Sequence, residues 1–126
     1  MSADAIKLVI PHDRPFYGIA RLVVGGLAAR HDMPLEQLED LQLALDSVLE
    51  NESYAADKDV TLELQMANDA VHVVVGPLDA RELVPDLERE SDGEGIGLRR
   101  LLGTVVEHAE LEDRDGATWL KLEKRK

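Results

Sequence analysis

Residues 34–54 (PLEQLEDLQLALDSVLENESY) constrain the fold more than any other part of the chain. Their apolar residues recur at helical spacing and predict one continuous stripe facing a core: Leu38, Leu41, Leu45, Val48 and Leu49. Pro34 suits a first helical position, and we expect the helix to end near residues 55–58. The rest of the chain must then be arranged around this central helix.

The other side of the same helix is unusual because it lacks the charged residues that a helix face exposed to bulk water usually has. Leu43, Ser47 and Asn51 follow one another at intervals of four, and Asp46 and Glu50 flank them. Two interpretations remain open: a second, smaller packing face, or the floor of a ligand pocket.

Length and charge bound the class of protein. The 126 residues are enough for a single domain, 1–126, with one core. The 26 acidic and 14 basic residues give a formal charge of −12, which disfavours direct nucleic-acid binding and favours partners with basic surfaces. Cysteine is absent, which removes disulfides and thiol catalysis. No apolar run approaches the roughly 18 residues of a membrane span, and residues 1–10 lack a signal-peptide pattern. We therefore expect a cytoplasmic protein with no membrane contact.

The remaining elements follow from local patterns. We expect a strand at residues 6–11, a helix opened by Asp13 and Pro15, and a hairpin in which residues 60–66 and 71–75 flank a turn at Asn68 and Asp69. Residues 76–94 hold two prolines and many charges, so we expect a long loop with one helical turn at 81–84 that is either a solvated connection or a lid. A third helix at 95–106, a strand at 107–112, a turn at 113–116 and a last strand at 118–122 complete the chain.

This order, β-α-α-β-β-α-β-β, predicts an α/β (α+β) two-layer sandwich. Its sheet would be mixed, largely antiparallel, and backed by three helices on one face.

Among candidate binding residues, Gly95 and Gly97 stand where the loop becomes a helix. The exposed N–H groups and the dipole there could receive phosphate, with Arg99 adding positive charge; a simple flexible entry to the helix is the alternative. The four histidines (His12, His31, His72, His108) share no metal-like spacing, and we expect surface or structural roles for them.

Leu43–Asn51 and Gly95–Leu101, with the order of elements around them, resemble the ATP-binding domain of the anti-sigma-factor serine/threonine kinases. These bacterial regulators have the Bergerat-type (GHKL) fold of histidine kinases, gyrase and Hsp90. The resemblance covers nearly the whole chain, and it implies that the long loop is a lid over ATP and that the protein forms a homodimer.

The resemblance carries over unevenly to individual residues. Asn51 matches the asparagine that holds Mg²⁺ near the ATP phosphates, and Gly95 and Gly97 match the second glycine box. The helical glutamate that assists phosphoryl transfer is replaced by Ser47; Asp46 and Glu50 are adjacent but point in other directions. The aspartate that recognises adenine is absent unless Asp79 substitutes for it.

We therefore expect a degenerate member of the family. It would regulate transcription by binding a sigma factor or an anti-anti-sigma factor, with ATP and Mg²⁺ binding weak or absent and little or no kinase activity. The alternatives are an active kinase that uses Asp46 or Glu50 on an anti-anti-sigma factor, and a nucleotide-sensing signalling module.

Overall fold

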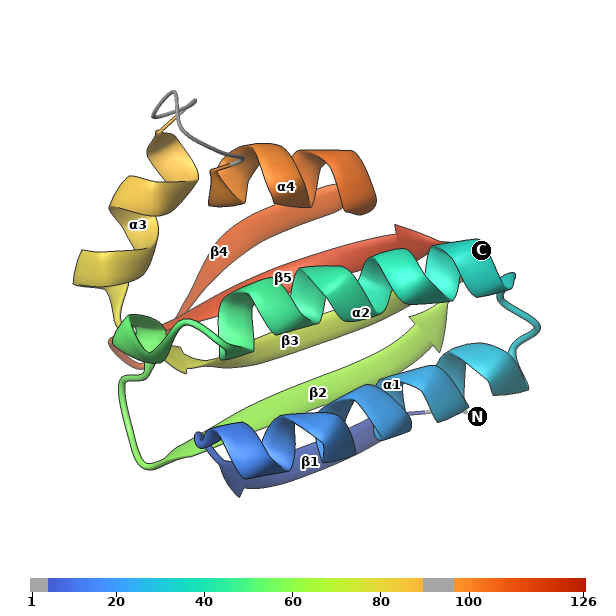
Figure 1. The fold of residues 1–126 in the computed structure, drawn as a ribbon, viewed down its shortest axis with the longest axis horizontal. Coiled ribbons are helices and arrows are strands. Elements are labelled where there is room, and N and C mark those ends of the chain that lie inside the picture. The colour runs from blue at the N-terminus through green and yellow to red at the C-terminus, as the bar shows by residue number, and fades with distance from the viewer. Residues whose placement is uncertain (1–4, 90–96) are drawn as a thin grey trace.

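The computed structural model describes residues 5–89 and 97–126, which form two layers, a five-stranded sheet and a set of helices on one of its faces (Figure 1). The sheet order is β1-β2-β3-β5-β4, and all four strand pairs are antiparallel. The strands are β1 (Ala5–Pro11), β2 (Asp59–Ala67), β3 (Ala70–Leu78), β4 (His108–Arg114) and β5 (Ala117–Arg125). The helices are α1 (Tyr17–Arg30), α2 (Leu35–Leu49), α3 (Ala80–Glu88) and α4 (Leu98–Val105), with short 3-10 turns η1 (Arg14–Phe16) and η2 (Glu52–Tyr54). The predicted two-layer α+β class is confirmed, although no strand pair in the described part is parallel.

Two hairpins form most of the sheet, and each has the turn that its sequence favours. Asn68 and Asp69 connect β2 to β3, and Asp115 and Gly116 connect β4 to β5; all four have positive φ. Two-residue turns of this kind match the twist of the flanking strands. Alternate residues of β2 (Val60, Leu62 and Leu64) are buried against the helices, as the period of two predicts.

The helix layer is centred on α2, which packs between α1 and α4 (Figure 1). Leu41, Leu45, Val48 and Leu49 are fully buried, so the predicted stripe faces the core. Among the described residues, no helix has both the length and the apolar character needed to cross a bilayer.

Two sequence predictions about element boundaries were wrong. The central helix ends at Leu49, before the expected residues 55–58, because the chain turns there into η2. The stretch expected to be a loop with one helical turn at 81–84 continues β3 to Leu78 and then forms the nine-residue helix α3, which includes that turn; residues 90–94 lie outside the described part. The described part therefore contains four α-helices, where three were expected.

Candidate functional site

The residues singled out by sequence gather around the C-terminal end of α2. Ser47 lies in its last turn, half-buried, and its Oγ donates a hydrogen bond to the Ala44 carbonyl oxygen at 2.7 Å. This bond inside the helix is a common one for serine. The hydroxyl is thus directed back along α2, and a serine cannot supply the carboxylate that a general base at this position would need.

Asn51 lies beyond the end of α2 and caps η2. Its Oδ1 accepts hydrogen bonds from the Ser53 backbone N at 3.1 Å and from the Ser53 Oγ at 2.6 Å, and the residue is exposed. Asparagine is one of the preferred capping residues because its side-chain oxygen satisfies a free backbone N–H. Because α2 stops at Leu49, the four-residue spacing does not place Ser47 and Asn51 on one helix face.

The two neighbouring acids point to different places. Asp46 faces α1, where its Oδ2 lies 3.4 Å from the Arg21 Nη1, and its other oxygen is buried without a hydrogen-bond partner among the described residues. Burial raises the pKa of Asp46, Arg21 opposes the rise, and Glu50 adds to it. Glu50 itself is exposed at the end of the helix. The structure therefore directs Asp46 toward α1 and leaves Glu50 at the exposed end of the helix.

A small hollow lies beside this helix end, between η2, α3 and the start of α4. Its volume is about 250 Å³. The residues that line it are Tyr54, Asp86, Arg89, Gly97 and Leu98.

A hydrogen bond between η2 and α3 closes one side of the hollow. The buried Tyr54 hydroxyl donates to the Asp86 Oδ2 at 2.5 Å, and burial, followed by this hydrogen bond, raises the pKa of Tyr54. Arg89 Nη1 lies 3.7 Å from the other Asp86 oxygen. The hollow is thus lined by polar groups that already bind one another.

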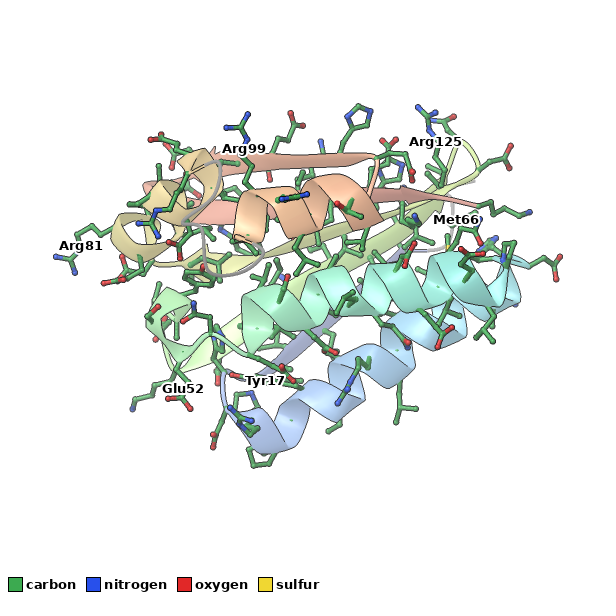
Figure 2. The ribbon with its side chains drawn as sticks, turned by 45° about the horizontal axis from the view of Figure 1, so that its top comes forward. Tyr17, Glu52, Met66, Arg81, Arg99 and Arg125 are labelled. Carbon is green, nitrogen blue, oxygen red and sulfur yellow. The ribbon has the colours of Figure 1, made fainter. Side chains whose placement is uncertain are left out.

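The start of α4 contributes Gly97 and Arg99. Gly97 is the residue before the helix and provides no side-chain cap, and it lines the hollow together with Leu98. Arg99 extends toward α3 (Figure 2), and its Nη1 donates to the Glu88 carbonyl oxygen at 3.4 Å. Gly95, the other predicted phosphate-binding glycine, lies outside the described residues.

Described residues that could contact ATP with Mg²⁺ already have partners within the protein. Small-molecule pockets usually measure about 300–1,000 Å³, whereas this hollow measures about 250 Å³, and the acid and the cation that line it, Asp86 and Arg89, lie 3.7 Å apart. Asp79, the only candidate for adenine recognition, instead caps α3 by accepting from the Arg81 backbone N at 3.0 Å, while the Arg81 side chain points away from the site (Figure 2). Over residues 5–89 and 97–126, no three acidic or histidine side chains are grouped to hold a metal ion.

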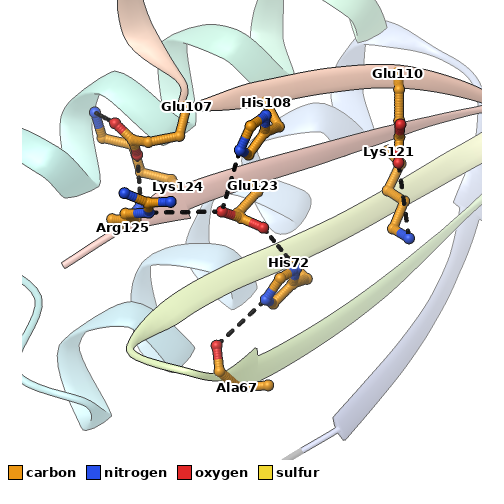
Figure 3. A network of polar contacts seen from close by, with 9 residues as sticks. All are labelled: Ala67, His72, Glu107, His108, Glu110, Lys121, Glu123, Lys124 and Arg125. Carbon is orange, nitrogen blue, oxygen red and sulfur yellow. Dashed lines mark hydrogen bonds and ion pairs between the residues drawn. The ribbon is translucent and has the colours of Figure 1, made fainter.

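Three of the histidines contact neighbouring elements of the fold, and none of the three lines the hollow. His72 on β3 and His108 on β4 flank Glu123 on β5, at 3.7 and 4.0 Å (Figure 3). His12 lies with its Nε2 3.3 Å from the Leu49 carbonyl oxygen at the end of α2. Both arrangements tie neighbouring elements of the fold to each other.

Sequence reasoning missed Tyr54, Asp86 and Arg89. One signal could have found α3, which carries two of them: Asp79 and Glu82 have the spacing of a capping box at a helix start. A buried tyrosine also needs a partner for its hydroxyl, but only the fold shows that the partner is Asp86.

Comparison with known proteins places this geometry in context. No family model matches the chain. The serine-protein kinase RsbW of Bacillus subtilis (strain 168) is 26% identical over 138 residues, which cover 93% of this chain and 83% of that protein. The RsbW of Bacillus pumilus (strain SAFR-032) is 26% identical over 137 residues with the same coverage, and that of Halalkalibacterium halodurans is 23% identical over 132 residues, covering 90% and 78%.

Proposed function

We propose that this chain, a distant relative of the serine-protein kinase RsbW, is an anti-sigma-factor-like regulator of transcription that acts in the cytoplasm by binding other proteins. Its partners are a sigma factor, an anti-anti-sigma factor, or both. ATP and Mg²⁺ bind weakly or not at all, and kinase activity is weak or absent.

The state of Ser47 carries this proposal. The family resemblance requires a carboxylate base at this position, and here a hydroxyl is hydrogen-bonded to its own helix at Ala44. Loss of a positioned general base typically reduces the rate of proton transfer by about 10²–10⁴. Asp46 does not replace it, because its carboxylate faces Arg21 on α1.

Weak nucleotide binding is supported by two side chains that are already engaged. Asn51 caps η2 and Asp79 caps α3. A nucleotide that recruited either group would have to break its capping bond, and a helix cap is worth about 0.5–2 kcal/mol. Adenine left without a buried partner would lose about 1–3 kcal/mol more.

The second candidate function is an active serine kinase, which the names of the relatives favour. It would need Asp46 or Glu50 to act on an anti-anti-sigma factor. A nucleotide-sensing module is the third candidate, favoured by the helix start at Gly97, which lines the hollow and has no side-chain cap.

Surface charge supports a protein partner with a basic surface. The formal charge of −12 speeds encounter with a positively charged protein and is screened by salt. We expect association to slow as ionic strength rises from about 50 to 300 mM, because the Debye length is near 10 Å at 0.1 M.

Calorimetry with Mg·ATP separates the candidates, with the RsbW of Bacillus subtilis as a matched control. We expect little heat at millimolar nucleotide for this chain; a micromolar dissociation constant would overturn the proposal.

A pull-down from the host lysate with and without Mg·ATP, read by mass spectrometry, tests the partner. Recovery of a sigma factor or its antagonist in both conditions supports regulation by binding. Recovery only with ATP, together with phosphate transfer to the partner, supports the kinase.

A further inference from the structure

The face of the sheet that the helices leave open (Figure 1) carries a second hollow, of about 570 Å³, which we call the sheet-face hollow. Its volume is more than twice that of the hollow at Tyr54, and it falls within the range of about 300–1,000 Å³ that small-molecule sites usually have. The lining residues on which the inference rests come from all five strands: Lys7, Glu63, Val74, Lys121, Glu112 and Arg114.

One row of side chains crosses this face. The strand registers set Lys7 opposite Glu63, Glu63 opposite Val74, and Val74 opposite Lys121. The neighbours of these residues along β2, β3 and β5 are buried in the core, so the row itself points away from the helices. Val74 therefore places an apolar side chain in the middle of the open face, between two strands that each carry a lysine.

Both lysines are available to a ligand. Lys7 lies opposite Glu63, but the Glu63 Oε1 is 2.9 Å from the Arg114 Nη1, and among residues 5–89 and 97–126 Lys7 has no ion-pair partner. The Lys121 Nζ lies 4.0 Å from the Glu110 Oε1 (Figure 3), and Glu110 is exposed. Exposed ion pairs of this kind contribute little free energy, so an anion can compete for the Lys121 amine.

Arg114 forms a fixed end of the hollow. Its Cζ lies 4.5 Å from the centroid of the Trp119 ring, and its Nε lies 2.7 Å from the Glu112 Oε2. The Trp119 ring packs directly on β3 at Gly76, where an added Cβ would lie 2.5 Å from a ring atom. Because Arg114 also binds Glu63, its charge is offset by two acids, and the two lysines carry the remaining positive charge of the lining.

We infer that the sheet-face hollow binds a small carboxylate that has an apolar body. The carboxylate lies between the amines of Lys7 and Lys121, and the apolar body packs on Val74 and Ala5, which also line the hollow. The Gln65 side chain, on the same face, adds an amide donor. This face is separated by the sheet from α2 and the hollow at Tyr54, so the inference stands whether or not the proposed function does.

Charge selects a carboxylate over other ligands. Three cations and two acids line the sheet-face hollow, which gives one net positive charge with His72 neutral, although the whole chain has a formal charge of −12. A monoanion neutralises this lining. A phosphate group, with a charge of about −1.5 to −2, would leave a negative excess, and a cationic ligand would be repelled by both lysines.

Nuclear magnetic resonance titration with benzoate tests the site, with benzamide as the neutral probe of matched shape. At constant ionic strength, benzoate should bind in the millimolar range, as expected for so small a ligand. The backbone amides that shift should be those of residues 5–7, 63–65, 72–74 and 121. Benzamide should bind at least about fivefold more weakly, because it lacks the charge that both lysines contact.

Substitutions assign the effect to the proposed residues. Lys7→Gln and Lys121→Gln should each weaken benzoate binding about threefold, and the double variant about tenfold. Lys58→Gln is the matched control, because Lys58 is an exposed lysine just before β2 that does not line the hollow, and it should bind like wild type. Val74→Glu should abolish binding with an unchanged circular dichroism spectrum, since it sets a carboxylate on the open face.

Four results would overturn the inference. One is the absence of saturable shifts at millimolar benzoate, and another is equal affinity for benzoate and benzamide. The third is wild-type affinity in the double lysine variant. The last is a Lys58→Gln variant that is weakened as much as Lys7→Gln, which would show that benzoate responds only to the total charge of the protein.

Discussion

The core-facing stripe of α2 and its polar C-terminal end contrast in what determines their side-chain positions. Leu41, Leu45, Val48 and Leu49 are each 0% exposed, and the helical period alone predicts their burial. At the polar end, Ser47 bonds to its own helix, Asp46 turns to α1 and Asn51 caps the next turn. The helical period determines which residues of α2 are buried, whereas local hydrogen bonds determine which polar side chains at its end can contact a ligand.

Of the substitutions that test this contrast, Leu45→Glu should have the largest effect on stability. The carboxylate would replace a fully buried leucine, so we expect a loss of more than about 4 kcal/mol in unfolding free energy, enough to unfold the protein. Circular dichroism and a thermal melt measure this directly.

Ser47→Glu, two residues further along the same helix, is the matched control. Ser47 is half-buried and has solvent on one side, so the variant should lose less than about 1 kcal/mol. Equal melting temperatures for the two variants would show that the helix faces are assigned wrongly.

Tyr54→Phe should have the next largest effect, because it removes the bond that ties η2 to α3. The Tyr54 hydroxyl donates to a carboxylate, and hydrogen bonds to charged groups contribute about 1.5–3 kcal/mol. Urea unfolding should show a loss of this size, with faster hydrogen exchange in α3. Tyr17→Phe is the control: Tyr17 is equally buried, but within the described residues its hydroxyl has no hydrogen bond, so a change below about 0.5 kcal/mol is expected. If both variants lose the same stability, the Asp86 contact is not what holds α3.

Most of the fold could be predicted from sequence because its signals are local. Alternation gave β2 and β3, and the turns at Asn68-Asp69 and Asp115-Gly116 follow from residues that tolerate positive φ. The prediction gave only one turn of α3, at 81–84, because Pro85 and the surrounding charges indicated a loop, although the helix has a capping aspartate at Asp79.

The candidate site was less predictable because it depends on where α2 ends. A helix continuing to residues 55–58 would have carried Asn51 on the same side as Ser47. The actual end at Leu49 converts Asn51 into a cap and buries Tyr54 against α3. Helix ends depend on competition between capping and continuation, which differ by about 1 kcal/mol, so sequence patterns place them poorly.

Asp46→Asn should produce the smallest effect, one visible in the pH dependence of stability. Burial raises the pKa of Asp46 above its ordinary 3.8, so the folded state holds this proton more tightly than the unfolded state. The stability from the protonated carboxyl is present below the unfolded pKa and is lost as pH rises through the folded pKa. Asparagine does not titrate, so the variant should gain stability relative to wild type between about pH 4 and pH 7.

Urea midpoints across this range measure the difference. Subtracting the two pH profiles removes the contribution that the other carboxylates make to both proteins. Arg21 opposes the rise in the pKa of Asp46, so Arg21→Met should increase the stability that the protein loses as pH rises. Glu50→Gln should change this loss of stability little. A difference between Asp46→Asn and wild type that stays constant across the range, or that shrinks as pH rises, would mean that Asp46 is solvated and free to act, which would favour the kinase.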